Sequence, residues 1–218
     1  MTAARLADEK ATLVLSYRAN RERALPLESL GALVQADITE AADRRRLLDA
    51  APALYGLVVL AGDPARVREG GSMEAATAHS MAVNFSGPML LAREAAERMK
   101  AAQSAGSIVL FSTMQAVNVV AGSTAYASAK VALQHAALVL AKEVRGFGIR
   151  VNVVAPGVTA AGMALASIAS GKYEHLIRDG IVPRYGRATD VAAAVRFFLE
   201  PDNYVTGQVL RVDGGATL

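Results

Sequence analysis

The sequence predicts an α/β fold in which helices cover both faces of a parallel sheet. Short apolar runs of strand length alternate along the chain with longer segments of helical pattern. The apolar runs are nearly continuous, as expected of strands that are buried on both faces. Polar residues or glycines follow several runs directly, at the sheet edge where ligands of such folds bind.

The composition indicates a single domain over residues 1–218. The chain is 53% hydrophobic and 5% aromatic and has no Cys or Trp, which suits a core of small aliphatic side chains. Without Cys there are no disulfides, no thiolate nucleophile and no Cys-bound metal, and no other metal-ligand spacing is seen.

Charge and hydropathy argue against two classes of partner. The net charge of +3 is small and dispersed, so we expect no nucleic-acid binding. The uncharged stretch at 101–129 is interrupted by polar residues and glycines, so we expect no membrane span. The N-terminus has charges of both signs and no signal-peptide pattern, and we expect a cytoplasmic protein.

Six segments have the length and composition of strands. They lie at 11–17, 32–36, 56–62, 107–112, 149–155 and 207–212. The first is the continuous apolar run Ala-Thr-Leu-Val-Leu-Ser-Tyr, typical of a sheet covered on both faces.

Helical segments separate these strands. We expect them at 4–9, 39–48, 72–103, 126–146 and 189–200, with one short helix inside the loop at 158–182. Thr39 and Thr189 are the expected N-caps, and Gly146 is the expected stop. Gly87 and Pro88 should bend or break the long segment near 84–88.

Tyr126 and Lys130 are the first candidates for chemistry. They lie four positions apart, so a helix places them on one face. A nearby ammonium favours the phenolate and lowers the pKa of a phenol, which makes a proton donor or acceptor. Taken alone, such a pair is also common on ordinary amphipathic helices. His79, His135 and His175 have no carboxylate or nucleophile motif nearby in the sequence, and we expect structural roles for them.

Several further motifs occur in a fixed order around this pair. They are Ala-Asp-Ile-Thr at 36–39, Ala61-Gly62, Asn84, the hydroxyls Ser112 and Thr113, Arg-Val-Asn-Val-Val-Ala-Pro-Gly at 150–157 and the segment 204–215. With these motifs the chain resembles the short-chain dehydrogenase/reductase family over nearly its whole length. The closest branch is the beta-ketoacyl-carrier-protein reductases.

The resemblance implies a Rossmann-like fold and NAD(P)H-dependent reduction of a carbonyl, such as a 3-oxoacyl group, or the reverse alcohol oxidation. It implies that Tyr126 exchanges a proton with the carbonyl oxygen, and that Lys130 holds the nicotinamide ribose and lowers the pKa of Tyr126. Asn84 would anchor a water that relays protons to Lys130. The substrate-orienting hydroxyl lies thirteen positions before the tyrosine, which is Thr113, with Ser112 as the alternative.

The same resemblance implies a set of cofactor contacts. The expected residues are Arg18, Asp37, Ala61, Gly62, Tyr126, Lys130, Pro156, Gly157 and Thr159. Arg18 directly follows a strand and favours NADP over NAD, because an arginine suits a 2′-phosphate; a solvated surface charge is an equal alternative. Asp37 would contact adenine, and its alternative role is electrostatic, at a helix terminus.

The sequence also departs from the family pattern. The family begins with a strand and a glycine-rich phosphate loop, whereas the first apolar run here matches the family's second strand, and no such glycine motif precedes residue 56. Val59-Leu60 replace an Asn-Asn pair, and Ala161 stands where a threonine is expected, with Thr159 nearby.

These departures predict an N-terminally shortened domain in which the first strand and phosphate loop are missing. Without the first strand, the sheet would have a gap or the neighbouring strands would have to pair. Without the phosphate loop, hydrogen bonds to the pyrophosphate are lost, and we expect weak dinucleotide binding. Two other interpretations remain open: a cofactor-deficient scaffold or partner subunit that retains the fold, and a shortened version of a longer protein.

The resemblance further implies a small-molecule carbonyl or alcohol substrate and a homodimer or homotetramer. The association would use helices at 86–103 and 126–146 and the strand at 207–213. The segment 158–182 would be the substrate lid, in which Met163 and Tyr173 are expected to pack rather than make specific contacts. The sequence leaves the substrate and the reaction direction open.

Overall fold

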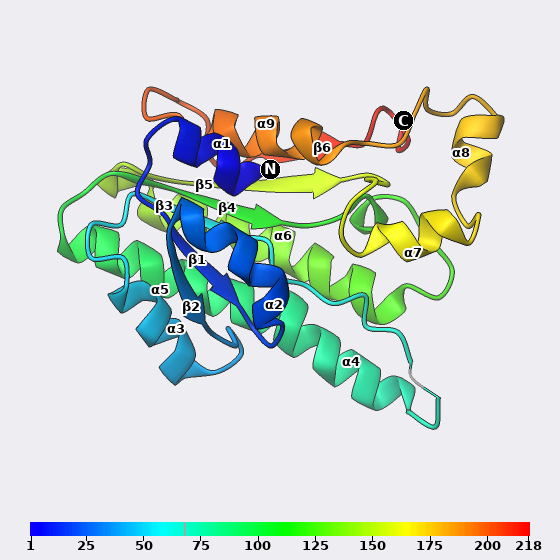
Figure 1. The fold of residues 1–218 in the computed structure, drawn as a ribbon, viewed down its shortest axis with the longest axis horizontal. Coiled ribbons are helices and arrows are strands. Elements are labelled where there is room, and N and C mark those ends of the chain that lie inside the picture. Colours follow the sequence, from blue (N-terminus) through cyan, green and yellow to red (C-terminus); the bar gives the residue numbers. More distant parts are fainter. Residues whose placement is uncertain (68) are drawn as a thin grey trace.

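The computed structural model describes residues 1–67 and 69–218 and has two parallel sheets (Figure 1). The first sheet pairs β1 with β2, and the second has the order β3-β4-β5-β6. The strands are β1 (Val14–Tyr17), β2 (Ala32–Gln35), β3 (Gly56–Val59), β4 (Gly106–Phe111), β5 (Ile149–Pro156) and β6 (Val209–Val212). Every strand pair is parallel, which confirms the predicted fold class.

Helices connect the strands and cover both faces of the larger sheet. They are α1 (Thr2–Asp8), α2 (Arg21–Ala24), α3 (Ala41–Asp49), α4 (Met73–Met81), α5 (Gly87–Ala101), α6 (Thr124–Val144), α7 (Ala164–Ala169), α8 (Glu174–Arg178) and α9 (Ala188–Leu199). No helix in the described part of the chain has both the length and the apolar composition needed to cross a membrane.

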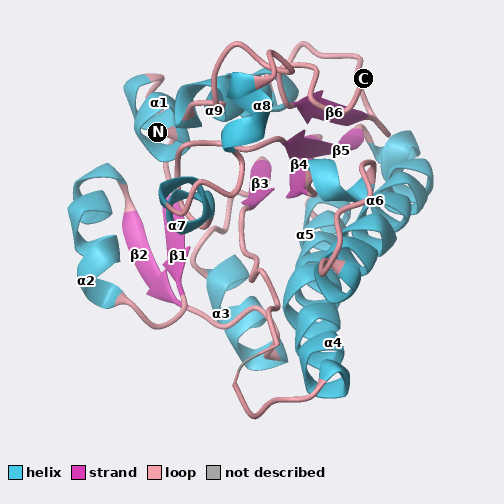
Figure 2. Cartoon of the chain, turned by 90° about the vertical axis from the view of Figure 1, so that its right-hand side faces the viewer, coloured by secondary structure: helices cyan, strands magenta, loops and turns pink. Residues whose placement is uncertain are grey.

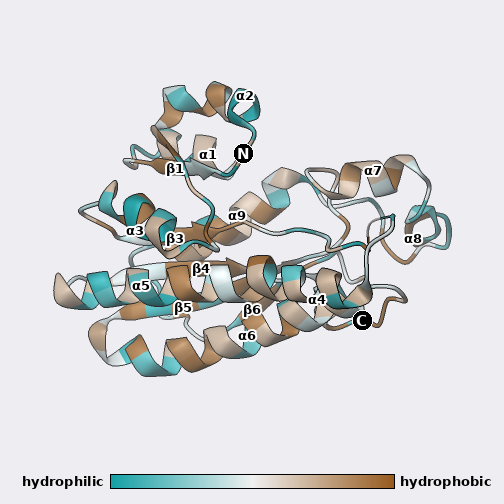
Figure 3. Ribbon diagram, turned by 90° about the horizontal axis from the view of Figure 1, so that it is seen from below, coloured by the Kyte–Doolittle hydropathy of each residue, from teal (hydrophilic) through white to brown (hydrophobic). Residues whose placement is uncertain are grey.

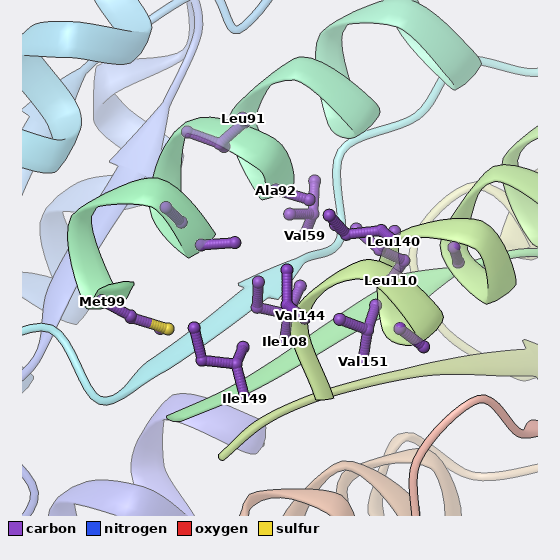
Figure 4. Packing of buried hydrophobic residues seen from close by; sticks show 14 of the residues in the cluster. Val59, Leu91, Ala92, Met99, Ile108, Leu110, Leu140, Val144, Ile149 and Val151 are labelled. Atoms are coloured by element: carbon purple, nitrogen blue, oxygen red, sulfur yellow. The ribbon is translucent and has the colours of Figure 1, made fainter. Parts of the chain in front are cut away.

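The alternation of side chains along β4 explains the two-sided core. Ile108 and Leu110 pack with residues of α5 and α6 on one face (Figure 4). Val109 and Phe111 point to the other face, where the α9 residue Phe198 joins their cluster. This burial on both faces accounts for the continuous apolar run predicted for the strand.

The N-terminal strands form a ribbon of their own. Within the described residues, no strand pairs with the second edge of β1 or of β3. Figure 3 shows β1, α1 and α2 standing apart from the layer that holds the four-stranded sheet. The ribbon is attached through side chains, because Val14 and Val34 pack against the core cluster that includes Leu47, Leu48 and Val59.

Both expected N-caps are wrong, and each for a local reason. The side chain of Asp37 accepts hydrogen bonds from the backbone N–H and the hydroxyl of Thr39, so this hydroxyl does not cap α3, which begins at Ala41. The helix α9 begins before Thr189, and Asp190 accepts the backbone N–H of its N-cap, Arg187. Competing hydrogen bonds from aspartates therefore decide both helix starts.

Of the other helix expectations, one is met and two need correction. The long segment is interrupted near 84–88, as expected: a π-helical turn over Ala82–Ser86, which contains Asn84, separates α4 from α5, and Pro88 lies in the first turn of α5. The helix α6 continues into a 3-10 turn beyond Gly146 and ends at Gly148, whose φ of 71° is the left-handed conformation that favours glycine. The segment 158–182 holds two short helices, α7 and α8, rather than one.

Candidate active site

The α6 helix presents Lys130 to the carboxyl end of β4. Lys130 is 3% exposed, and its Nζ donates a 2.8 Å hydrogen bond to the carbonyl oxygen of Phe111, the last residue of that strand. Burial disfavours the ammonium and lowers the pKa of Lys130 to about 8. The lysine is thus fixed in place with a pKa close to neutral pH.

Tyr126 lies one helical turn before Lys130 and is half-buried. Burial is the largest influence and raises the pKa of its phenol, while a hydrogen bond with the Thr113 side chain partly opposes this rise and the charge of Tyr173 adds to it. The direction differs from the expected lowering by Lys130, because desolvation dominates and the ammonium is bonded to Phe111. The phenol therefore remains protonated at neutral pH.

The two hydroxyls after β4 have different partners. Ser112 is 5% exposed; its Oγ donates to the carbonyl oxygen of Lys130 at 3.3 Å and accepts from Gln134 Nε2 at 2.8 Å. The Thr113 side chain lies near enough to the Tyr126 phenol to lower its pKa, and its Oγ1 accepts the backbone N–H of Gln115 at 3.3 Å. Thr113 thus lies beside the phenol, whereas the hydroxyl of Ser112 joins the end of β4 to α6.

Asn84 is fully buried in the π-helical turn and holds the loop after β3. Its Oδ1 accepts the backbone N–H of Asp63 at 3.0 Å, and its Nδ2 donates to the carbonyl oxygen of Asp63 at 2.9 Å and to Ser80 Oγ at 3.0 Å. Both amide hydrogens are therefore used within the protein. The water-anchoring role that the resemblance implied for Asn84 stays a prediction.

Gly62 lies against these groups at the end of β3. A Cβ at this position would stand 3.1 Å from Asn84 Oδ1 and 3.6 Å from Lys130 Nζ. The missing side chain leaves the space beside the Lys130 ammonium open, as required if a ribose is to reach it. This is the structural observation that fits a dinucleotide to the site.

His79 was expected to have no carboxylate nearby, but in the folded chain it lies beside Asp63. Its Nε2 lies 3.6 Å from Asp63 Oδ2, and this buried nitrogen has no hydrogen-bond partner among the described residues. His135 and His175 are exposed on α6 and α8. No group of three or more potential metal-binding side chains occurs in the ranges 1–67 and 69–218.

Arg18 and Asp37 form a second group at the ends of β1 and β2. Arg18 is exposed and borders an open hollow lined by 19–22. Hydrogen bonds from Thr39 lower the pKa of Asp37 most strongly, and the charge of Arg18 contributes to the lowering. The oxygen Oδ1 of Asp37 is occupied by Thr39.

The remaining cofactor candidates shape the start of the lid. The backbone N–H of Gly157 donates to Val212 in β6, and a Cβ on this glycine would lie 2.7 Å from the Cα of Asp213. Thr159 Oγ1 donates to the carbonyl oxygen of Gly157 at 3.2 Å. Pro156 ends β5, while Ala61 is exposed after β3.

The predicted residues therefore fall into three places. The site proper unites Gly62, Asn84, Thr113, Tyr126 and Lys130. The pair of Arg18 and Asp37 lies on the separate ribbon, and the segment 156–159 borders the lid. In the central group, the Tyr126 phenol can donate a proton to an oxygen atom of a ligand. The Lys130 ammonium lies beside the open turn at Gly62.

Sequence reasoning missed several partners of these residues. They are Asp63, Arg66, Ser80, Gln134 and Ser167. Two of these partners could have been found from helical spacing, because Ser80 lies four positions before Asn84 and Gln134 lies four positions after Lys130. Contacts such as that of Arg66 Nη2 with Ser167 Oγ join distant segments and leave no local signal.

Comparison with known proteins agrees with this geometry. A family model described as enoyl-(acyl carrier protein) reductase matches residues 1–217. An NADPH-dependent aldehyde reductase-like protein of Arabidopsis thaliana is 32% identical over 84% of this chain and 70% of its own length. A human 3-oxoacyl-[acyl-carrier-protein] reductase is 40% identical over 62% of this chain and 54% of its own length.

A solved structure shares the whole arrangement. A short-chain type dehydrogenase/reductase from Mycobacterium ulcerans superposes with a TM-score of 0.88 at 27% identity, covering 99% of this chain and 84% of that one. The chain nevertheless spans only about half the length of several curated relatives that it matches, 48% and 54% in two of them.

Proposed function

The chain belongs to the short-chain dehydrogenase/reductase family, and from this premise we propose that it is an NAD(P)H-dependent oxidoreductase that reduces a carbonyl or oxidises the corresponding alcohol. The observation that carries the proposal is the position of the Tyr126 phenol, which lies beside the Thr113 hydroxyl and one helical turn before the buried Lys130. The human and Arabidopsis relatives have names that indicate carbonyl reduction.

In this proposal Tyr126 is the general acid of the reduction. A bound nicotinamide dinucleotide supplies the hydride that the carbonyl carbon receives. Tyr126 donates its phenolic proton to the carbonyl oxygen, and Thr113 donates a second hydrogen bond that orients this oxygen. Burial raises the pKa of Tyr126, which keeps the proton available for donation at neutral pH.

Lys130 holds the nicotinamide ribose in the space that Gly62 leaves open. Asn84 acts as a positioning residue, because it fixes the backbone of Asp63 directly after Gly62. The polar groups around the ammonium are thus held before any ligand arrives, and such preorganisation favours catalysis.

We infer NADP as the preferred dinucleotide. Arg18 is an exposed cation at the end of β1, where a ribose 2′-phosphate would be recognised, and the Arabidopsis relative is named for NADPH. A lower KM for NADPH than for NADH that disappears in Arg18→Gln would support this inference.

The substrate site lies between Tyr126 and the lid at 158–182. Met163 and Leu165 expose apolar side chains there, and the charge of Tyr173 influences Tyr126. We propose a small carbonyl substrate with an apolar neighbouring group. Candidates are a 3-oxoacyl thioester and an aldehyde, the classes in the names of the human and Arabidopsis relatives.

An oxidation assay of NADPH with acetoacetyl thioester, simple ketones and aldehydes tests the proposal. The unaltered chain should consume NADPH only when a carbonyl is present, and Tyr126→Phe should abolish this consumption. Reduction that continues unchanged in Tyr126→Phe would overturn the assignment of the acid.

A second candidate is a cofactor-deficient scaffold or partner subunit. The observation that favours it is the separation of the β1–β2 ribbon, which bears Arg18, from the sheet that leads to Lys130. Calorimetric titration with NADPH separates the two proposals. A Kd below about 100 μM, near −5.5 kcal/mol, would exclude the scaffold.

We also propose self-association through α5 and α6. Leu90, Val131 and Leu138 are exposed apolar residues on these helices, and the last two lie seven positions apart on one face. Light scattering should give a dimer or tetramer mass; a monomer at micromolar concentration would contradict this proposal.

A further inference from the structure

The turn after β3 is held rigidly. Asp63 is bonded to Asn84 through both its backbone N–H and its carbonyl oxygen, and Asp63 Oδ1 accepts the backbone N–H of Ala65 at 2.7 Å. Ala65 is buried and has a φ of 49°, a left-handed conformation that residues with a side chain rarely adopt. The next side chain, Arg66, therefore leaves the turn in a fixed direction.

Arg66 reaches across the molecule to the lid. Its Nη2 donates a 2.9 Å hydrogen bond to Ser167 Oγ, in a buried residue of α7. In the part of the chain that the structure describes, Arg66 forms no ion pair with a carboxylate. A guanidinium has five N–H donors, so a neutral hydroxyl that occupies one of them leaves most of its capacity for an anion.

The position of this turn matters for the proposed cofactor. Figure 2 shows the β1–β2 ribbon beyond β3, while β4, β5 and β6 follow on the other side. A dinucleotide that extends from Lys130 to Arg18 must cross the carboxyl edge of β3, because ligands of parallel α/β folds lie along that edge. Arg66 follows Gly62 by four residues, in the loop that leaves the carboxyl end of β3.

The pyrophosphate at the middle of a dinucleotide needs donors at this crossing. A glycine-rich turn at a helix N-terminus is a common source of them. Gly31 is the sole glycine among residues 1–55, and it precedes β2, at the opposite edge of the sheet. It also packs against Leu13, where a Cβ would lie 2.3 Å from the carbonyl oxygen.

We propose that Arg66 binds the pyrophosphate of the dinucleotide, with Ser167 as the positioning residue that holds its guanidinium toward the crossing. The inference rests on the proposed function and adds a binding residue to it. A planar guanidinium matches phosphate oxygens in a bidentate way, and one N–H bonded to Ser167 fixes the plane of the fork.

Calorimetric titration with NADPH and with NADH tests the inference in four proteins: the unaltered chain, Arg66→Gln, Arg66→Lys and Arg145→Gln. Arg145 is the matched control, because it is exposed and precedes β5, at the far edge of the sheet. Arg66→Gln should raise both Kd values by about tenfold, the scale of one exposed charge-assisted contact. Arg66→Lys should recover part of this loss, and Arg145→Gln should change either Kd by less than about twofold.

Each other outcome counts against the inference. Unchanged Kd values in Arg66→Gln would overturn it while leaving the proposed function intact. A loss confined to NADPH would place the guanidinium on the 2′-phosphate, and an equal loss in Arg145→Gln would show a general charge effect; both overturn it. If the unaltered chain binds neither dinucleotide, the proposed function fails and this inference fails with it. Thermal unfolding of Arg66→Gln should match that of the unaltered chain, which excludes a purely structural role.

Discussion

Asn84 and Asp63 are joined by two hydrogen bonds, one in each direction, between a buried side-chain amide and a loop backbone. The same amide also donates to Ser80 Oγ, which in turn donates to the carbonyl oxygen of Ala125. This network ties the end of β3 to α4 and to the start of α6. Asn84 lies in the π-helical turn between α4 and α5, and this turn faces the loop after β3.

Replacement of Asn84 should therefore weaken the fold as well as the site. Asn84→Ala leaves the backbone N–H and carbonyl of Asp63 and the hydroxyl of Ser80 without this partner, so we expect a loss of about 2–4 kcal/mol in the free energy of unfolding. Urea denaturation measures it. Asn118→Ala is the control, because Asn118 is exposed and should change the value by less than about 0.5 kcal/mol. Equal stability of the two variants would mean that the network contributes nothing.

Tyr126→Phe should separate catalysis from binding. The change removes the proton donor while the ring still fills its half-buried position, so kcat/KM should fall by about 10²–10⁴ while the Kd for NADPH stays within about twofold. Steady-state kinetics and titration measure the two quantities. Tyr204→Phe, at a fully exposed position, is the control and should keep full activity.

The two adjacent hydroxyls should respond in opposite ways. Thr113→Val keeps the shape of the side chain but removes the hydroxyl beside Tyr126 and the acceptor of the Gln115 backbone N–H. We therefore expect kcat/KM to fall about tenfold or more, and the free energy of unfolding to fall by no more than about 1 kcal/mol. Ser112→Ala removes the partner of Gln134 and of the Lys130 carbonyl, so we expect a loss of about 1–3 kcal/mol in the free energy of unfolding. If Ser112→Ala instead lost activity at unchanged stability, Ser112 would be the orienting hydroxyl.

Local patterns predicted most of the elements and the side chains that lie together at the carboxyl edge of the sheet, while their roles came from the resemblance. Tyr126 and Lys130 share a helix face because they lie four positions apart, and Thr113 and Gly62 follow strands whose carboxyl ends meet at one edge. The resemblance added the role of Asn84 but not its partners.

The remaining features depend on contacts between distant segments. The loop after β3 contacts both α4 and α7, and this brings Asp63 to His79 and Arg66 to Ser167. Sequence reasoning also left two outcomes open for the strands, a gap or new pairing, and packing decides between them: β1 and β3 do not pair. The pKa of Tyr126 was mispredicted because burial outweighs a neighbouring charge.

Lys130 gives a prediction about pH. Burial lowers its pKa in the folded protein to about 8 from 10.5, so between these values the unfolded chain binds more protons than the folded chain. The free energy of unfolding should therefore rise with pH across this window, by at most about 1.4 kcal/mol per unit and by about 2 kcal/mol up to pH 9.5.

Urea denaturation of the unaltered chain and of Lys130→Met at several pH values measures this rise. The comparison stops near pH 9.5, about half a unit below the reference pKa of a phenol, ~10. Above the reference pKa the folded chain keeps the Tyr126 proton longer than the unfolded chain does, because burial raises the pKa of Tyr126, and stability falls as the pH rises. Lys130→Met has no ammonium to bury, so its stability should lack the rise that the unaltered chain shows. Lys142→Met, which removes an exposed lysine from the same helix, should retain the rise. Parallel profiles for the unaltered chain and Lys130→Met would mean that the Phe111 carbonyl compensates the ammonium fully for its lost hydration, and that Lys130 titrates like an exposed lysine.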